Sequence, residues 1–265
     1  MIKKSARRFL EKALSKAGYA LVPEKNWKRL KEISAFSKSE LSLTKILGKV
    51  LESKKIDCVF DVGANMGQFA TMLRRDANYE GWIVSFEPLP ELAGPLTKIA
   101  ASDPKWEVVA CALGKECGRK TLNRTEENVF SSFLEPDRNQ PSKYSESNRV
   151  IDEVAVDVDT VDSLWGNYKD RLSVSRLFLK MDTQGYDLEV FNGASGSLAE
   201  IPAILSEISF SRIYDGAPTF SESLECFISS GFSPALFVPI SFDSSGAAIE
   251  MDSIFVSHGD TVTSP

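Results

Sequence analysis

The segment at residues 57–70, DCVFDVGANMGQFA, constrains the fold most strongly. Strand-forming residues lead directly into a turn with two glycines, and a helical stretch follows. In an open α/β sheet, such a turn lets a ligand approach the backbone closely, while the helix N-terminus favours negative charge. The spacing Asp61-x-Gly63-x-x-x-Gly67 is not the GxGxxG of dinucleotide enzymes. The turn therefore predicts a ligand site of another kind.

Strand-like and helical stretches alternate after this turn. We expect strands at 57–61, 82–86, 106–110, 176–181 and 203–208, and helices near 67–76, 90–101, 187–199 and 220–230. This order predicts an α/β fold with a Rossmann-like, doubly wound, mostly parallel sheet. Two β-rich runs at 233–240 and 253–258 flank a turn-rich segment and predict an antiparallel close of the sheet. The polar segment 118–150 is expected to be a lid or a mobile loop.

The charge distribution suggests three parts. Residues 1–31 contain ten lysines and arginines against two glutamates, although the whole chain has a net charge of −6. We expect a basic helical extension at 1–45, the main domain at 46–257 and a tail at 258–265. The basic amphipathic helix at the start of the extension either docks on the domain or rests on an anionic membrane or partner. The acidic remainder argues against nucleic acid as the main partner.

The cysteines and the hydropathy pattern bear on location. Four cysteines lack the spacing of a zinc site, and no signal peptide precedes them. We therefore expect reduced thiols and a cytoplasmic protein. No apolar run reaches the roughly 20 residues that cross a bilayer.

An acidic residue follows the second expected strand. Glu87 lies 20 residues after Gly67, in the sequence VSFEPLP. A carboxylate at this place is suited to hold both hydroxyls of a ribose, so a nucleoside ligand is predicted. A D-x-G-x-x-x-G turn combined with a strand-terminal acid is the pattern of S-adenosylmethionine-dependent methyltransferases.

Further motifs narrow the resemblance. The segments FDVGANMGQFA, SFEPLPE, VVACALG, VDVDTVDSL, LFLKMDTQGYDLEVFNGA and ILSEI occur in this order over residues 57 to about 257. Together they resemble the FkbM family of methyltransferases. The resemblance implies O-methylation of a hydroxyl on a sugar, glycan or secondary metabolite, with S-adenosylmethionine as the methyl donor. The implied donor-binding residues are Asp61, Gly63, Ala64, Asn65, Gly67, Phe69, Glu87, Pro88, Cys111 and Ala112.

Within the donor set, the turn would surround the methionine portion, Glu87 would hold the ribose, and Cys111 with Ala112 would flank the adenine. Two positions depart from the family pattern: Gln184 stands where the family usually has Glu, and Cys111 where it usually has Asn. Ser131 and Ser132 match a serine-rich turn of the family and are expected to face the acceptor. Ordinary turn chemistry is the alternative for both serines.

The catalytic candidates are Asp182, Lys180 and Glu207. Asp182 follows the strand at 176–181, at the sheet edge where ligands of α/β folds bind, and can accept the proton of an alcohol as a general base. A helix-capping role or an ion pair with Lys180 is the alternative for Asp182. Glu207 ends the next strand, where it either acts in the site or forms a buried pair with Lys180.

A metal is not favoured. Mg²⁺ held by Asp182 and Glu207 is possible, but no dense group of carboxylates follows Asp182. His258, the only histidine, receives no role.

Two other functions were weighed. A nicotinamide-dependent oxidoreductase shares the strand and turn pattern but lacks the glycine spacing and a Tyr-x-x-x-Lys pair. A non-catalytic nucleoside-binding module would retain the turn without the chemistry. The sequence identifies neither the acceptor nor the oligomeric state.

Overall fold

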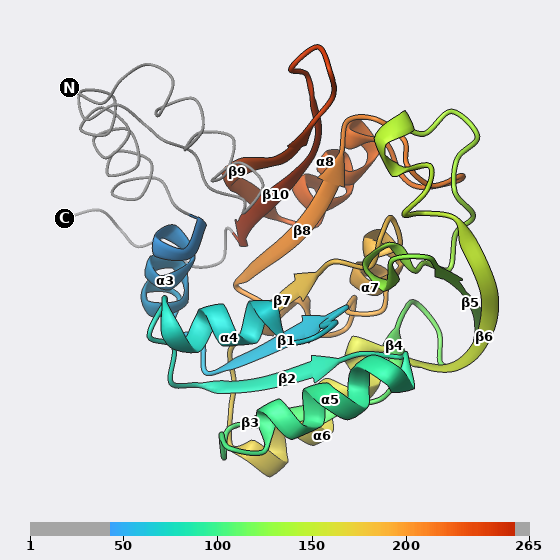
Figure 1. Ribbon diagram of the computed structural model, residues 1–265. Coiled ribbons are helices and arrows are strands. Elements are labelled where there is room, and N and C mark those ends of the chain that lie inside the picture. The colour runs from blue at the N-terminus through green and yellow to red at the C-terminus, as the bar shows by residue number, and fades with distance from the viewer. Residues whose placement is uncertain (1–42, 258–265) are drawn as a thin grey trace, which may run out of the picture. The chain divides into compact units, whose positions relative to one another are not determined.

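The computed structural model describes residues 43–257 (Figure 1). The expected helix at the N-terminus and His258 lie outside these residues. The first described helix, α3 (Leu43–Ser53), buries Leu47 and Leu51. Residues 47–257 belong to one compact unit, which is the subject of the following paragraphs.

The unit is built on a seven-stranded sheet with the order β3-β2-β1-β7-β8-β10-β9. Strands β3, β2, β1, β7 and β8 run parallel, whereas β10 pairs antiparallel with both β8 and β9. The Rossmann-like, mostly parallel fold and its antiparallel close are therefore confirmed. The strands are β1 (Cys58–Val62), β2 (Trp82–Phe86), β3 (Trp106–Val109), β7 (Leu177–Met181), β8 (Ala203–Ser209), β9 (Phe232–Phe242) and β10 (Ala248–Ser257).

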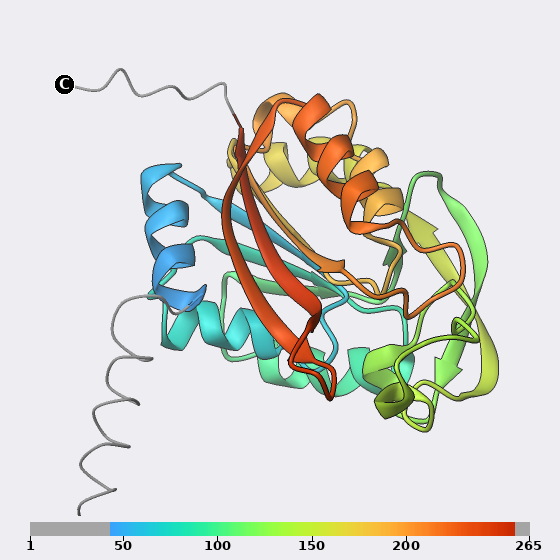
Figure 2. The same cartoon turned by 90° about the horizontal axis from the view of Figure 1, so that it is seen from above.

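Helices cover both faces of this sheet (Figure 2). Helices α4 (Gln68–Arg75) and α5 (Pro90–Ala100) lie on one face. The other face carries α6 (Val161–Leu172), α7 (Asp187–Asn192) and α8 (Phe220–Ser229). The central strands β1 and β7 are buried along their whole length, as expected for parallel strands covered on both sides.

The expectation for 118–150 was wrong at its start. Residues Gly118–Thr125 form β5, which pairs antiparallel with β6 (Val150–Asp159), and β4 (Ala112–Leu113) joins β6 on its other side. Charged side chains cover the exposed part of β5 and hide its strand character in the sequence. The signal was in β6, where Val154, Val156 and Val158 alternate with acidic or small residues and pack against α5.

The helical elements also differ from expectation. Helix α6 was not expected; it begins with a capping box in which Thr160 accepts from the backbone N–H of Ser163. Helix α7 ends at Asn192 instead of 199, and a 3-10 turn at Leu198–Glu200 follows. Two further 3-10 turns lie in the polar segment, at Asn128–Phe130 and Ser142–Tyr144.

Two sequence-based expectations concern thiols and membranes. All four cysteines are described, and none is in a disulfide. Among residues 43–257, no helix combines the length and apolarity that a bilayer span requires.

A polar row crosses the centre of the sheet. In the strand register, Asp61 of β1 lies between Ser85 of β2 and Lys180 of β7. Ser85 Oγ donates to Asp61 Oδ2 at 3.0 Å, and Trp106 Nε1 donates to Ser85 Oγ at 3.0 Å. Each of these polar groups is buried, so each needs a partner from a neighbouring strand. The row fixes the sheet directly beneath the turn after β1.

Candidate active site

The turn after β1 has the left-handed conformations that its sequence indicates. Gly63, Asn65 and Gly67 have φ angles of 72°, 49° and 78°. A Cβ added to Gly63 would lie 2.0 Å from the backbone oxygen of Asp182, and one added to Gly67 would lie 2.5 Å from Leu96 Cδ1. The protein's own packing therefore requires a glycine at 63 and favours one at 67, and the approach of a ligand to this turn stays a prediction.

Gly63→Ala is expected to lower the free energy of unfolding by at least about 2 kcal/mol, because the left-handed backbone and the contact with Asp182 both oppose a side chain. Gly94→Ala in α5 is the control, since a Cβ there meets nothing within 4 Å and alanine favours a helix. Urea denaturation of both variants measures the difference. Equal stability of the two variants would contradict this packing argument.

Glu87 directly follows β2 and connects the turn to the start of α5. Its Oε2 accepts from the backbone N–H of Asn65 at 2.8 Å, and its Oε1 accepts from that of Leu89 at 2.9 Å. Burial raises the pKa of Glu87, although these two hydrogen bonds act in the opposite direction. A carboxylate has about four acceptor positions, so each oxygen retains one for a ligand hydroxyl.

Lys180 forms an ion pair beneath the turn. Its Nζ lies 3.0 Å from Asp61 Oδ1 and 3.6 Å from Asp182 Oδ2, and it donates to the backbone oxygens of Val62 and Gly63. Burial alone would lower the pKa of Lys180, but the carboxylates of Asp61 and Asp182 outweigh it and raise the pKa. Lys180 does not pair with Glu207, although the sequence left that pair open as an alternative. Lys180 instead connects Asp182 to the turn at residues 63–67, the donor turn.

Asp182 lies directly after β7, at the carboxyl edge of the sheet. Its backbone N–H donates to the oxygen of Val62, and its side chain is 40% exposed. The alternative interpretation of Asp182, an ion pair with Lys180, is present. It leaves the Asp182 carboxylate partly exposed to solvent and beside the donor turn.

Gln184 joins the two candidate carboxylates. Its Nε2 donates to Asp182 Oδ1 and to Glu207 Oε2, each at 3.0 Å. The Tyr214 hydroxyl donates to Gln184 Oε1 at 2.7 Å. A terminal amide has two N–H donors, one for each carboxylate, whereas the glutamate usual in the family has none when ionised. At position 184, where the family usually has Glu, this chain therefore has an amide that orients the Asp182 carboxylate.

The environments of the two carboxylates differ. Burial, followed by the charge of Asp182, raises the pKa of Glu207 well above its ordinary value. Burial likewise raises the pKa of Asp252 on β10 to about 6, with Asp182 as the next cause. Glu207 is held by the Gln184 amide, whereas the side chain of Asp182 is 40% exposed.

Asp187 was not singled out by the sequence, and it fixes the loop after β7. Its Oδ1 accepts from the backbone N–H and the hydroxyl of Thr183, and its Oδ2 accepts from Ser206 Oγ and the backbone N–H of Glu207. Burial raises the pKa of Asp187. The signal in the sequence was only its place at the first turn of a helix, which is a common place for an acidic residue.

The two candidate serines take part in local hydrogen bonds. Ser132 is buried; its hydroxyl donates to the backbone oxygen of Gln184 at 2.8 Å and accepts from the N–H of Leu134. Ser131 Oγ accepts from the N–H of Thr125. Ser132 thus ties the polar segment to the loop that carries Gln184, and its role toward an acceptor stays a prediction.

The remaining donor candidates lie around the turn and the end of β3. The Phe69 ring lies under Lys180 Nζ, 5.6 Å from ring centroid to nitrogen. Ala64 and Ala112 are buried, and Pro88 is half-buried. Cys111 lies between β3 and β4, and burial raises the pKa of its thiol to about 12, so it behaves as a neutral wall residue. Their contacts with a donor stay predictions.

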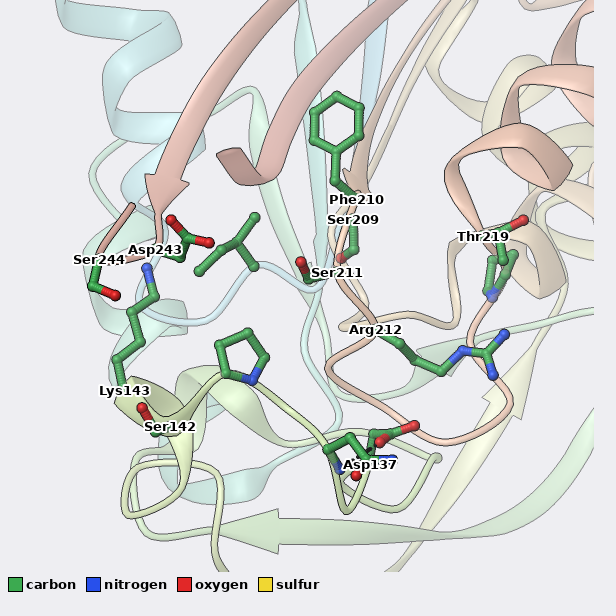
Figure 3. Close-up of a pocket in the computed structure, with 14 residues that line it drawn as sticks. Asp137, Ser142, Lys143, Ser209, Phe210, Ser211, Arg212, Thr219, Asp243 and Ser244 are labelled. Carbon is green, nitrogen blue, oxygen red and sulfur yellow. Dashed lines mark hydrogen bonds between the residues drawn. The ribbon is translucent and has the colours of Figure 1, made fainter. Parts of the chain in front are cut away.

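A cavity of about 760 Å³ opens beyond the end of β8 (Figure 3). Its walls come from residues 137–143, residues 209–212, the start of α8 and the β9–β10 turn. The donor turn and Asp182 do not line it. The segment 211–215 connects the two regions, because Tyr214 holds Gln184 and the backbone N–H of Asp137 donates to the oxygen of Ile213.

Metal ligands were also sought in the described part of the chain. No group of three or more His, Cys, Asp or Glu side chains there is arranged to hold a metal ion.

The chain is similar to several solved structures. The magnesium protoporphyrin IX methyltransferase of Synechocystis PCC 6803, solved with SAM, is 9% identical, with a TM-score of 0.40 over 90% of this chain and 99% of that chain. An O-methyltransferase from Bacillus cereus in complex with SAH is 10% identical, with a TM-score of 0.42 over 94% and 97%. Such low scores carry no information about the acceptor of this chain.

Family membership rests on the sequence. No curated protein matches the chain significantly. The family model described as the Methyltransferase FkbM domain matches residues 61–234, from the aspartate of the donor turn to the start of β9. The matched range includes Glu87, Asp182 and Glu207, and it covers well over half of the chain. The chain therefore belongs to the FkbM methyltransferase family.

Proposed function

We propose that the protein is an S-adenosylmethionine-dependent O-methyltransferase that acts on a hydroxyl of a sugar, glycan or secondary metabolite. The observation that carries this proposal is the arrangement at one sheet edge. The donor turn touches Asp182 through Gly63, and Lys180 bonds to both the turn and Asp182. A methyltransferase needs this proximity, because donor and proton acceptor must meet at one hydroxyl.

The residues present fit the methyl donor. Glu87 is a buried carboxylate with acceptor positions left after two backbone hydrogen bonds, which suits the two hydroxyls of a ribose. Asn65, Met66 and Gln68 supply the partly or fully exposed surface of the turn beside it. When bound, S-adenosylmethionine supplies a methyl group on a positively charged sulfur.

The protein's contribution is then alignment and proton transfer. Holding two reactants in line is worth up to about 7–11 kcal/mol in favourable intramolecular reactions. Asp182 accepts the hydroxyl proton as the oxygen attacks, and Gln184 holds the carboxylate in one orientation through Nε2. Lys180 keeps the Asp182 carboxylate and the donor turn at a fixed separation, because its Nζ contacts Asp182 Oδ2 and the backbone oxygens of Val62 and Gly63. No metal takes part in this proposal.

The acceptor and the location follow as proposals from the same features. The acidic body of the chain favours a small molecule or glycan over nucleic acid. The reduced cysteines favour a cytoplasmic site of action.

Loss of the Glu87 carboxylate is expected to weaken donor binding. Glu87→Ala should raise the Kd of S-adenosylhomocysteine roughly 10- to 100-fold, because hydrogen bonds to a charged group are worth about 1.5–3 kcal/mol. Isothermal titration calorimetry measures it, with Glu91→Ala as the control, since the exposed Glu91 pairs with Arg124 instead of the turn.

The 2′-deoxy analogue of S-adenosylhomocysteine separates ribose binding from support of the turn. Wild type should bind this analogue more weakly than the parent compound, and Glu87→Ala should bind both equally. If the variant still discriminates between the two, Glu87 does not hold the ribose and acts only on the turn.

A further inference from the structure

The cavity beyond β8 is placed to hold a part of the acceptor distant from the reacting hydroxyl. Ser209 lines it and lies two residues after Glu207 on β8, so both side chains share one face of the strand. Two residues of strand span about 7 Å, roughly the length of one sugar unit. Asp182 Oδ1 and Glu207 Oε2 each lie 3.0 Å from Gln184 Nε2, so an acceptor with its reacting hydroxyl at Asp182 needs at least two sugar units to reach the cavity.

Arg212 is an exposed residue that lines this cavity. Among residues 43–257, no hydrogen bond or close ion pair holds its guanidinium, whose five N–H donors face solvent. Glu222 is the carboxylate beside it, but Glu222 Oε2 accepts from the N–H and hydroxyl of Thr219 in the capping box of α8. In Figure 3, Arg212 extends along the cavity towards Thr219.

The other charged groups of the cavity are engaged in local structure. Asp243 Oδ1 accepts from the backbone N–H groups of Ser245 and Ala247, and Asp137 Oδ1 accepts from that of Asn139. Lys143 Nζ donates to the backbone oxygen of Phe242 at 3.0 Å, on the opposite side of the cavity from Arg212 (Figure 3). The planar guanidinium of Arg212 is therefore the charged group of the cavity that can donate hydrogen bonds to an incoming ligand from both of its own edges.

The remaining lining suits a sugar ring. Phe210 is 47% exposed, and its ring stacks on Phe220 with the centroids 4.8 Å apart, so the pair is a rigid apolar surface. Three residues with hydroxyls, Ser209, Ser211 and Thr219, also line the cavity. Each group suits one part of a carbohydrate. The aromatic ring suits the apolar face of a sugar, the hydroxyls suit the sugar hydroxyls, and the guanidinium, which has no described partner, suits an acidic substituent.

We propose that the acceptor is an anionic carbohydrate of at least two units, whose carboxylate or phosphate is bound by Arg212 in this cavity while a hydroxyl of the neighbouring unit lies at Asp182. This inference rests on the proposed function. Arg binds both carboxylate and phosphate in a bidentate manner, so the shared feature is a planar or branched anion.

The test uses the full chain saturated with S-adenosylhomocysteine and titrates it with matched disaccharides. Each set contains a neutral glucose disaccharide, the same compound with a terminal glucuronate, and the same compound with a 6-phosphate. We expect an anionic member to bind roughly 10- to 100-fold more tightly than the neutral one, and Arg212→Gln to remove that preference. The carboxylate and phosphate members show which anion is preferred.

Arg119→Gln is the matched control, because Arg119 is an exposed arginine on β5 that pairs with Asp157 at 3.2 Å away from the cavity. It should keep the preference, and thermal melting should show both variants folded. Equal affinity for neutral and anionic members, including no binding of any, would overturn the inference, as would a preference that survives Arg212→Gln. Methyl transfer to a neutral sugar at a rate that Arg212→Gln leaves unchanged would overturn the inference and leave the proposed function standing.

Discussion

Asp182→Asn is expected to slow methyl transfer roughly 10²- to 10⁴-fold, because an amide has nearly the size of the carboxylate but does not accept the hydroxyl proton. Affinity for S-adenosylhomocysteine should stay close to that of wild type. The introduced amide can still present its oxygen to Gln184 Nε2, so the loop after β7 should keep its geometry. Single-turnover rates with labelled donor measure the effect.

Asp170→Asn is the control for this substitution, because Asp170 lies exposed on α6, away from the donor turn. Activity of wild type with and without EDTA is measured in the same series. A fully active Asp182→Asn variant would remove Asp182 from the chemistry. Loss of wild-type activity on chelation, restored by Mg²⁺, would overturn the metal-free proposal and give Asp182 the role of a ligand.

Lys180→Met is expected to lower the free energy of unfolding by about 3–5 kcal/mol, because it leaves the carboxylate of Asp61 buried without its cation. The Lys180 side chain is 5% exposed and that of Asp61 is completely buried, so water does not replace the lost partner. Urea denaturation at neutral pH measures the loss.

Two further variants separate this effect from ordinary loss of an ion pair. Lys169→Met removes a pair with Glu200 that is more than one-third exposed, and it should cost less than about 1 kcal/mol. The double variant Asp61→Asn/Lys180→Met should recover part of the stability, since the uncompensated charge is gone. Equal costs for Lys180→Met and Lys169→Met would contradict the buried row at the centre of the sheet.

The parallel sheet and the donor turn could be predicted because their signals are local. The strand before Gly63 is apolar apart from Asp61, and the turn itself requires residues that tolerate positive φ. Glu87 could be placed because its strand ends next to that of Asp61 in any doubly wound sheet.

The contacts of the site could not be read from the sequence, because they join residues far apart in the chain. Gln184 meets Glu207 across 23 positions and Tyr214 across 30, so its amide appeared only as a departure from a family pattern. The partner of Lys180 depended on strand register, which places Asp61, and not Glu207, beside it. The second sheet was missed because the exposed charged residues of β5 conceal its strand character in the sequence. Its pairing with β6 is visible only in the structure.

The reason for the glycines was likewise invisible before the structure. A close approach at Gly63 was predicted, but its neighbour is the backbone of Asp182, 119 positions later in the chain. The sequence indicates that a residue must be small, whereas only the packed sheet identifies what comes close to it.

Methyl transfer itself tests the central claim most directly. The purified full chain is incubated with S-adenosylmethionine labelled in its methyl group and a panel of neutral and anionic hydroxylated glycans and metabolites, and the products are analysed by mass spectrometry. We predict that at least one acceptor gains one labelled methyl on oxygen, with S-adenosylhomocysteine formed in equal amount and both products formed far more slowly by Asp182→Asn. Tight donor binding without methyl transfer to any member of the panel would contradict the account and favour a non-catalytic nucleoside-binding module.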